Sequence, residues 1–359
     1  MKVALVYDRV NKWGGAERVL QALGELFPDA PLYTSVYDEK RATWAKSFDV
    51  RPSFLQKIPF TKSNHEFIPF MMPVAFEQFS FDKYDLVISL TSESAKGVIT
   101  KPETKHISYI LTPTRYLWSG YKDYLNTRFK RLAAQPFTRY LRKWDKIAAH
   151  RPDFFVSISK EVQKRLKNYY GQESSVIYPP SSLIDDVDNK AISEKRGSFY
   201  LVVSRFVPYK KIDLAIQACN LLKHPLKIIG SGRDEGMLRK IAGPTIEFLG
   251  KVNDDKLVEY YKKCKALIFP GVEDFGLTVV EAQHFGAPII AFRGGGALET
   301  IIEGKTGCFF EQPNRESLVG VLRKYDSYQF NPKAAMQNAQ NFSKKNFKAN
   351  FQSMVNSLF

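Results

Sequence analysis

Cysteine is scarce in this chain of 359 residues, and the three that occur, Cys219, Cys264 and Cys308, lie far apart. An odd, scattered set matches neither a disulfide framework nor the close spacing of metal ligands. Such usage is typical of a protein that works in a reducing compartment such as the cytoplasm. The sequence therefore predicts neither a stapled fold nor a metal site.

Long apolar runs are also missing. No run approaches the roughly 18 residues that a membrane-spanning helix requires. The N-terminus, MKVALVYDRV, has no extended apolar core and passes straight into a predicted strand, so it does not resemble a signal peptide. We therefore expect no spanning segment and no cleaved leader.

Two further motifs are missing from the places where they would bind a ligand, and acids are too few to balance the bases. No Gly-x-Gly-x-x-Gly occurs, which argues against a dinucleotide site, and no Asp-x-Asp appears in the context expected of a metal-bound diphosphate. Asp185-Asp186 and Asp254-Asp255 are adjacent pairs in polar segments. Lys and Arg number 53 against 37 acids, so the net charge is +16. This charge suits nucleic acid, an anionic membrane surface or a polyanionic substrate.

The most informative stretch is 266–290, ALIFPGVEDFGLTVVEAQHFGAPII. Its apolar start predicts a buried strand over 266–269, and a helix is expected from about Gly276 to Phe285. A second strand is expected over 288–292. This order of elements predicts a parallel crossover unit, in which ligands bind at the carboxyl ends of the strands.

Two carboxylates, Glu273 and Glu281, flank the predicted start of that helix. The N–H groups of Gly276, Leu277 and Thr278 would point at an anion there. Acids beside an anion site suit a ligand with both phosphates and hydroxyls, such as a nucleotide sugar. The alternative is that Glu281 is an ordinary helix-start acid and Glu273 a solvated loop acid.

The context of these acids resembles a known family. E-D-F-G-L-T-V-V-E-A, then G-A-P and R-G-G-G-A-L-E, are similar to the signature of group 1 (family 4) retaining glycosyltransferases of GT-B fold, of the mannosyltransferase-like kind. The resemblance implies two Rossmann-like α/β domains that face a central cleft. It implies an acceptor-side domain over 1–182, a nucleotide-sugar domain over 183–343, and a C-terminal helix, 344–359, that crosses back to the first domain. The polar stretch 181–197 is the expected linker.

In the second domain, Arg205 follows a predicted strand and Lys210 stands five residues later. Two cations so placed can clamp one diphosphate from two directions. The resemblance implies that Glu273 orients the sugar hydroxyls and that Glu281 holds the ribose. It also implies that Gly230 lies near the nucleoside and that Val252 borders the base.

In the first domain, Gly14 and Gly15 stand between a predicted strand and helix, where paired glycines let backbone approach a ligand closely. The resemblance places them near the donor diphosphate and the acceptor, and it adds Arg115 from P-T-R-Y-L-W. The family often carries a histidine in the place of Leu111. His106, at the start of that strand, is a poor substitute, and His65 is expected at the surface.

Residues 126–151 form a basic and aromatic run, NTRFKRLAAQPFTRYLRKWDKIAAHR, with Asp145 as the one acid. Such a helix can lie on an anionic bilayer. The alternative is a solvated helix face over a buried stripe of Phe137, Leu141 and Trp144. The two interpretations are compatible, because long basic side chains can cover apolar surface.

The resemblance implies retaining transfer of a sugar, expected to be mannose from GDP-mannose, without a metal or other cofactor. The expected acceptor is a glycan or lipid-linked oligosaccharide of a surface polysaccharide. The enzyme is expected in the cytoplasm, peripheral at the inner face of the cell membrane. Another GT-B enzyme, such as a nucleotide-sugar 2-epimerase, is one alternative. A non-catalytic nucleic-acid binder is another, although no nucleic-acid-binding motif supports it.

Overall fold

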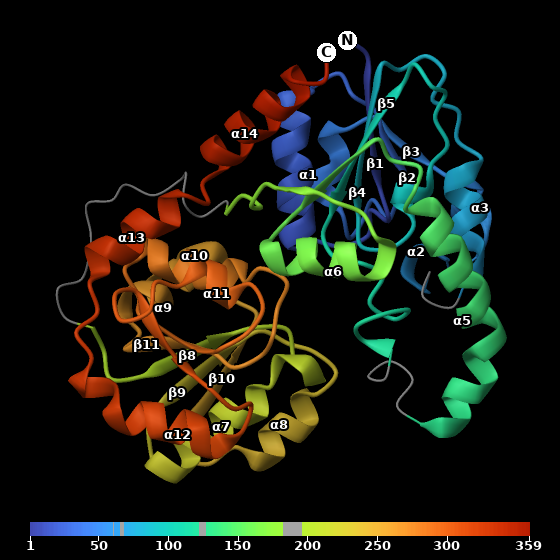
Figure 1. Cartoon of the computed structure of the whole chain (residues 1–359). Coiled ribbons are helices and arrows are strands. Elements are labelled where there is room, and N and C mark those ends of the chain that lie inside the picture. Colours follow the sequence, from blue (N-terminus) through green and yellow to red (C-terminus); the bar gives the residue numbers. More distant parts are fainter. Residues whose placement is uncertain (60, 65–67, 122–126, 182–195) are drawn as a thin grey trace. The chain divides into compact units, whose positions relative to one another are not determined.

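The structure, a computed structural model, describes residues 1–59, 61–64, 68–121, 127–181 and 196–359. They divide into two compact units (Figure 1). Unit 1 comprises Met1–Pro179 together with Lys348–Phe359, and unit 2 comprises Pro180–Phe347. Most of the predicted linker, and His65, lie outside the described residues.

Unit 1 is built on a parallel sheet with the strand order β3-β2-β1-β4-β5-β6-β7. Every residue of β1 and β4 is buried. Continuous apolar runs of this kind are typical of parallel strands covered on both faces. The strands are β1 (Val3–Tyr7), β2 (Leu32–Thr34), β3 (Val50–Pro52), β4 (Leu86–Thr91), β5 (Lys105–Ile110), β6 (Phe154–Ser157) and β7 (Ser175–Val176).

The helices of unit 1 include the predicted C-terminal one, since residues of α14 from Lys348 onward belong to this unit. The Phe351 ring lies 6.4 Å from that of Tyr109, and Lys348 pairs with Glu25 at 3.1 Å. The α-helices are α1 (Gly15–Leu26), α2 (Thr61–Asn64), α3 (Met72–Glu77), α5 (Arg128–Ala148), α6 (Lys160–Tyr170) and α14 (Lys344–Asn356). Short 3₁₀ turns are η1 (Thr43–Ser47), η2 (Phe54–Lys57), η4 (Pro69–Met71) and η5 (Ala95–Gly97).

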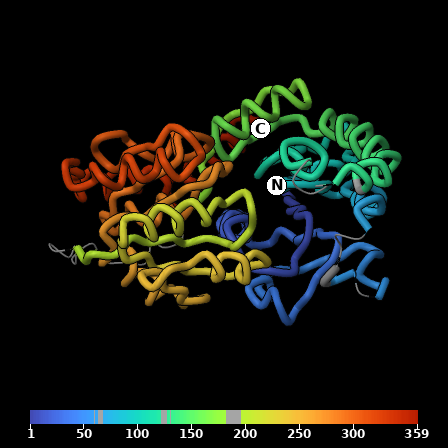
Figure 2. Tube along the Cα trace, turned by 90° about the horizontal axis from the view of Figure 1, so that it is seen from below, coloured from blue at the N-terminus to red at the C-terminus, as the bar shows by residue number. Residues whose placement is uncertain are grey.

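Unit 2 has its own parallel sheet, in the order β10-β9-β8-β11-β12-β13. Its strands are β8 (Tyr200–Val203), β9 (Leu226–Ile229), β10 (Ile246–Gly250), β11 (Ala266–Phe269), β12 (Ile289–Phe292) and β13 (Gly307–Phe310). Its helices are α7 (Ile212–Leu222), α8 (Glu235–Ile241), α9 (Asp254–Lys263), α10 (Leu277–His284), α11 (Ala297–Thr300), α12 (Arg315–Lys324) and α13 (Pro332–Gln340), with η7 (Pro208–Lys210) and η8 (Tyr325–Ser327). Strands and helices alternate from β8 to α12, and Figure 2 draws the chain of this unit as a tube that runs from yellow-green to red.

The sheet of unit 2 separates two apolar clusters. Tyr200 and Val202 pack with α7, α8 and α12, whereas Leu201 packs with α9 and α10. This division follows from the strand, because successive side chains point to opposite faces. The predicted crossover unit is confirmed, since β11, α10 and β12 occupy 266–269, 277–284 and 289–292 and the two strands pair in parallel.

The predicted buried stripe of α5 is only partly correct. Leu141 is buried and Trp144 is half-buried, but the Phe137 side chain is 57% exposed. The face of α5 that meets unit 1 passes instead through Thr138, Leu141, Asp145 and Ala148. By helical position Phe137 lies near the side of Leu141 and Ala148, but its ring lies 6.1 Å from the exposed ring of Phe70 and not in the core.

No helix in the described part of the chain is long and apolar enough to cross a membrane. The three cysteines are free thiols in the interior, and burial raises their pKa to about 12.

Candidate active site

At the carboxyl edge of the unit 2 sheet, the loop after β9 crosses the loop after β8 at very short range. A Cβ on Gly230 would lie 1.8 Å from the Ser204 carbonyl oxygen, and one on Gly232 would lie 2.4 Å from that of Phe206. The Phe206 N–H donates to the Ser231 carbonyl at 2.9 Å. Only glycine permits this crossing, which fixes the backbone that carries Arg205.

Lys210 is brought to Glu273 by a second close approach. The η7 turn packs on Gly271 so closely that a Cβ there would lie 2.6 Å from the Tyr209 carbonyl oxygen. The Lys210 ammonium then forms an ion pair with the Glu273 carboxylate, and their side chains are 10% and 22% exposed. Arg205 is exposed at the same edge, and its Nη2 donates to the Tyr209 hydroxyl at 3.1 Å. The structure therefore gathers the three predicted catalytic residues around one turn.

The glycine run after β12 supports the backbone of Glu273. The Gly296 N–H donates to the Glu273 carbonyl at 2.9 Å. A Cβ on Gly295, whose φ is +60°, would lie 2.3 Å from that same oxygen, and one on Gly296 would lie 2.3 Å from Phe275 Cα. The sequence predicts a turn at R-G-G-G, but only the structure shows that this turn positions the acidic loop.

The N-terminus of α10 opens beside that loop. Gly276 precedes the helix with φ +95°, a conformation that favours glycine. The N–H groups of Val279 and Val280 both donate to the Gly276 carbonyl, at 3.0 and 3.4 Å, so only the N–H groups before them, those of Gly276, Leu277 and Thr278, precede the first hydrogen bonds of the helix. Leu277 and Thr278 are half-buried. These N–H groups and the positive end of the helix dipole suit an anion.

Glu281 lies one turn inside α10 and is only 3% exposed. Its Oε2 accepts a hydrogen bond from the Tyr261 hydroxyl of α9 at 3.0 Å. Val252 is half-buried against the apolar cluster on the same side of the sheet. Sequence reasoning missed Tyr261, because its role depends on a contact between two helices.

In unit 1, the glycine pair precedes α1. Gly14 is extended, with φ −179°, and a Cβ on it would lie 3.2 Å from Glu17 Oε2. Glu17 is buried and accepts from the Tyr7 hydroxyl at 2.6 Å. Burial, with Glu17 adding to it, raises the pKa of Tyr7. The acid of G-G-A-E-R thus anchors the glycine loop to β1.

Asp8, which the sequence analysis did not single out, organises the neighbouring loop. Its carboxylate accepts from the backbone N–H groups of residues 92–95 at 2.7–3.0 Å and from the Thr91 hydroxyl at 2.9 Å. Burial, followed by the charge of Glu93, raises the pKa of Asp8. Next to it, Arg9 pairs with Glu93 at 2.5 Å. The sequence did offer one signal for Asp8. An acid directly after a central strand must lie at the carboxyl edge of the sheet, where ligands bind.

Asp145 is a second buried carboxylate that the sequence did not reveal as such. It pairs with Lys96 at 2.6 Å and accepts from Trp118 Nε1 at 2.7 Å and from the Tyr170 hydroxyl at 2.6 Å. The Thr114 hydroxyl also donates to it at 3.1 Å. Thr114 and Trp118 flank the half-buried Arg115, so α5 holds the loop that carries this residue.

His106, which the sequence analysis set aside as a poor substitute for the family histidine, lies in the core. Its Nε2 is 2.9 Å from the Ser89 hydroxyl, and the ring is fully buried. Burial, with the charge of Arg151, lowers its pKa to about 3. Leu111 stands half-buried at the end of the same segment.

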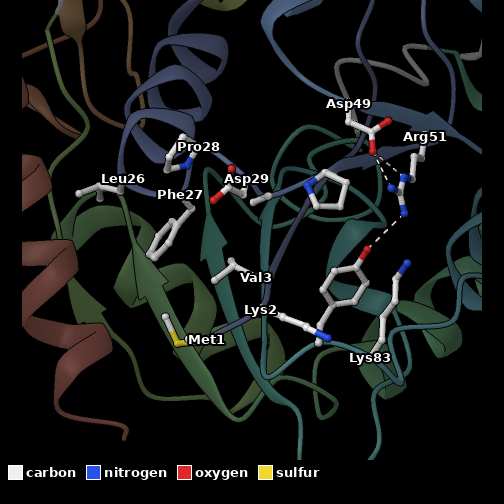
Figure 3. A pocket seen from close by; sticks show the side chains of 13 residues that line it. Met1, Lys2, Val3, Leu26, Phe27, Pro28, Asp29, Asp49, Arg51 and Lys83 are labelled. Carbon is white, nitrogen blue, oxygen red and sulfur yellow. Dashed lines mark hydrogen bonds and ion pairs between the residues drawn. The ribbon is translucent and has the colours of Figure 1, made fainter.

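A separate hollow of about 570 Å³ lies at the opposite, amino edge of the unit 1 sheet (Figure 3). Among its lining residues, Arg51 is held by Asp49 at 2.5 Å and by the Tyr33 hydroxyl at 3.0 Å. Ligands of open parallel sheets bind at the carboxyl edge, so we do not assign this hollow to the active site. In the described part of the chain, no group of three or more His, Cys, Asp or Glu side chains could hold a metal ion. A metal-independent reaction remains a prediction.

Comparison with known proteins identifies the unit 2 region. Residues 184–342 match the family described as Glycosyl transferases group 1. An uncharacterized glycosyltransferase of Methanocaldococcus jannaschii is 30% identical over 57% of this chain and 58% of its own length. An O-antigen chain mannosyltransferase C of Escherichia coli is 26% identical over 52% of each chain. An alpha-1,3/1,6-mannosyltransferase of Dictyostelium discoideum is 25% identical over 78% and 77%. The chain thus spans little more than half the length of the first two curated relatives.

Solved structures resemble the whole chain. The lipopolysaccharide outer core galactosyltransferase WaaB has a TM-score of 0.69 at 18% identity and full coverage of both chains. Anabaena HepE, solved with UDP and glucose, has a TM-score of 0.72 at 17% identity, covering 99% of this chain and all of that one. At such identities the likeness shows the fold. Residues 184–342, in unit 2, thus match the group 1 glycosyltransferase family, and the two parallel-sheet, Rossmann-like units give the chain the GT-B fold of these solved glycosyltransferases.

Proposed function

We propose that this protein transfers a sugar from a nucleoside diphosphate sugar to an acceptor hydroxyl with retention of anomeric configuration. The observation that carries the proposal is the Lys210–Glu273 ion pair beside the N-terminus of α10. It combines a cation and free N–H groups for a diphosphate with a carboxylate for sugar hydroxyls, within one set of loops at the carboxyl edge of the sheet.

In the proposed reaction, the bond between the anomeric carbon and the β-phosphate oxygen breaks while charge builds on the diphosphate. Arg205, Lys210 and the N–H groups of Gly276 to Thr278 would stabilise that charge. Glu273 would accept hydrogen bonds from the sugar and so hold the anomeric carbon toward the acceptor. The acceptor oxygen bonds on the face that the phosphate leaves, and its proton passes to the departing phosphate oxygen.

Glu281 would hold the ribose, with Tyr261 fixing the carboxylate from behind at 3.0 Å. Gly230 and Val252 would border the nucleoside, and Gly14, Gly15 and Arg115 would serve the acceptor side in unit 1. The buried contacts of Asp8, Glu17 and Asp145 order the loops that carry the unit 1 residues. Each of these roles is part of the proposal.

For the donor we propose GDP-mannose, and for the acceptor a glycan or lipid-linked oligosaccharide of a surface polysaccharide. The names of similar proteins support this choice. They include two mannosyltransferases and a GDP-mannose-dependent mannosyltransferase of Corynebacterium glutamicum, 28% identical over 47% of this chain, which acts on a phosphatidylinositol mannoside. Transfer to such an acceptor would take place at the cytoplasmic face of the membrane.

The test is a panel of nucleotide sugars, with hydrolysis and transfer both followed by chromatography and the product anomer assigned by NMR. We expect turnover with GDP-mannose and retention in the glycoside. Arg205→Ala and Lys210→Ala should each reduce turnover by on the order of 100-fold. Lys240→Ala, an exposed residue of α8, is the matched control.

An inverted product would rule out the retaining mechanism. Interconversion of the nucleotide sugar at C2, without transfer, would instead assign the site to an epimerase. Full turnover by both Arg205→Ala and Lys210→Ala would show that these two cations have no role in the mechanism.

A further inference from the structure

Helix α5 carries an apolar stripe on a side that faces away from unit 1. Phe129, Leu132, Pro136, Tyr140 and Ile147 follow one another at spacings of three, four, four and seven residues, so they share one side of the helix. All are exposed, Phe129 by 80% and Leu132 by 68%. The side that packs on unit 1 is a different one, formed by Thr138, Leu141, Asp145 and Ala148. The helix therefore has two sides with apolar residues, and only one of them is buried.

A neighbouring element enlarges the exposed face. Figures 1 and 2 show α5 beside α3 at the outside of unit 1. The Phe137 ring lies 6.1 Å from that of Phe70, and both side chains are exposed. Val74 of α3 is also 51% exposed. We call Phe70, Val74, Phe129, Leu132, Phe137 and Tyr140 the α5 patch. An exposed apolar patch drawn from two elements marks an interaction site.

Among the described residues of α5, the exposed charges beside the patch are of one sign. Arg128, Arg139 and Lys143 are exposed and lie along one flank of the stripe by helical position. The sole acid of the run, Asp145, is buried and paired with Lys96, so it does not offset them.

Two other cations of the basic run 126–151 are bound to groups within the protein. Arg142 donates to the Leu117 carbonyl at 2.8 Å, and Arg151 pairs with Glu77 at 2.7 Å. The surface charge of α5 therefore depends on a smaller set than the sequence suggests.

We infer that the α5 patch docks on an anionic lipid surface, with the aromatic and aliphatic side chains entering the headgroup boundary and the flanking cations on lipid phosphates. This is the geometry of a helix that lies in a membrane interface. A second copy of the chain is a poor occupant, because face-to-face pairing would bring like charges together. The inference rests on the proposed function, in that a lipid-linked acceptor lies at the same surface. Asp145 then links the docked helix to the loop of Arg115.

The test uses the full chain and sedimentation with vesicles, a readout independent of transfer. We expect binding to phosphatidylcholine vesicles that contain phosphatidylglycerol and little binding to phosphatidylcholine alone. Each cation at such a surface contributes about fivefold in affinity, so Arg128→Gln, Arg139→Gln and Lys143→Gln together should weaken binding on the order of 100-fold. The control of equal charge is Lys305→Gln, Arg323→Gln and Lys324→Gln on unit 2.

A second variant tests the apolar part. Phe129→Ser, Leu132→Ser and Phe137→Ser should lower the vesicle affinity at least tenfold and leave donor hydrolysis unchanged, whereas Leu221→Ser and Met237→Ser, exposed on unit 2, should not change binding. Raising the salt from about 0.1 M to about 1 M should release the protein, since the Debye length falls from about 10 Å to about 3 Å.

Equal binding to neutral and anionic vesicles would overturn the inference, as would binding by both α5 variants at the level of the unit 2 controls. So would a dimer in solution that the apolar variant dissociates, because a second copy would then cover the patch. Loss of transfer with intact vesicle binding would count against the proposed function alone.

Discussion

Replacing Lys210 by alanine is the sharpest test of the donor site. In the structure the Lys210 ammonium is paired with Glu273 in surroundings that leave its side chain 10% exposed. Without it, a bound diphosphate would meet the Glu273 carboxylate with no cation between them. Removal of one preorganised group that stabilises charge in a transition state costs about 10²–10³-fold in kcat, or about 2.7–4 kcal/mol.

The same change also affects the resting protein. Glu273 would remain largely buried without its ionic partner, and an unsatisfied polar group of this kind costs about 1–3 kcal/mol. Its side chain is 22% exposed, so water can reach the carboxylate and the lower part of this range applies. Thermal melting of the variant should therefore show a modest loss of stability and a folded protein at assay temperature.

Glu273→Gln supplies the complementary measurement. The lysine keeps its charge and loses its carboxylate partner, so calorimetry should find GDP bound at least as tightly as by the unaltered protein, while kcat falls. Residues in contact are coupled by about 0.5–3 kcal/mol, so the double variant should deviate from the sum of the single ones by that amount. A Lys210→Ala enzyme with a kcat within a few fold of the original would refute the reasoning. Additive effects within about 0.3–0.5 kcal/mol would show that the ion pair has no role.

Three further predictions concern the surroundings of the site. Glu281→Ala should weaken nucleotide binding more than it lowers kcat, and Tyr261→Phe should act in the same direction by about 0.5–1.5 kcal/mol, since one hydrogen bond to Glu281 is lost; unchanged affinities in calorimetry would exclude Glu281 from the nucleotide site. Arg196→Ala should lower Tm by about 5 °C or more, because its guanidinium donates to the carbonyls of Tyr261, Cys264 and Phe285 at the ends of α9 and α10; an unchanged Tm would show that these bonds are redundant. The native His106 ring, with its pKa lowered to about 3, stays neutral while the unfolded ring takes up a proton below about pH 6.5. The protein should therefore lose about 1.4 kcal/mol of stability per pH unit as the pH falls below that value, a loss that His106→Gln should lack in urea unfolding between pH 7 and 5; parallel pH profiles would contradict the burial of the ring.

The sequence predicted the strand–helix–strand crossover unit of 266–292 because its apolar runs, and the glycines between them, mark where each element begins and ends. The β11–α10–β12 order follows from such local signals, whereas the C-terminal helix and the two-unit α/β architecture were expected from the family resemblance. The strand β3 was not predicted, since Val50–Pro52 is short and none of its residues is fully buried. This strand forms because its backbone pairs with β2. A pattern of three side chains cannot predict such a pairing.

The candidate site shows the same division. Spacing and residue type indicated Arg205, Lys210, Glu273 and Glu281, because a strand end and a helix start fix where such residues lie. The burial of Asp8 and Asp145 was not predicted from the sequence, since an acid is expected at the surface unless its hydrogen-bond donors are known. Those donors come from residues 83 to 87 positions away for Asp8, and 25 to 49 positions away for Asp145.

The sequence by itself determined the fold class, the resemblance to a family and the residue types at the carboxyl edge of the unit 2 sheet, because each depends on short-range patterns. Only the tertiary structure decided which charged side chains form ion pairs within the protein and which remain at the surface. It pairs Lys210 with Glu273, Lys96 with Asp145 and Arg151 with Glu77, and it leaves Arg128, Arg139 and Lys143 at the surface beside exposed aromatic rings. The physical reason is that burial and ion pairing join residues distant in the chain, so a charge counted in the sequence acquires its role only when its neighbours in space are known.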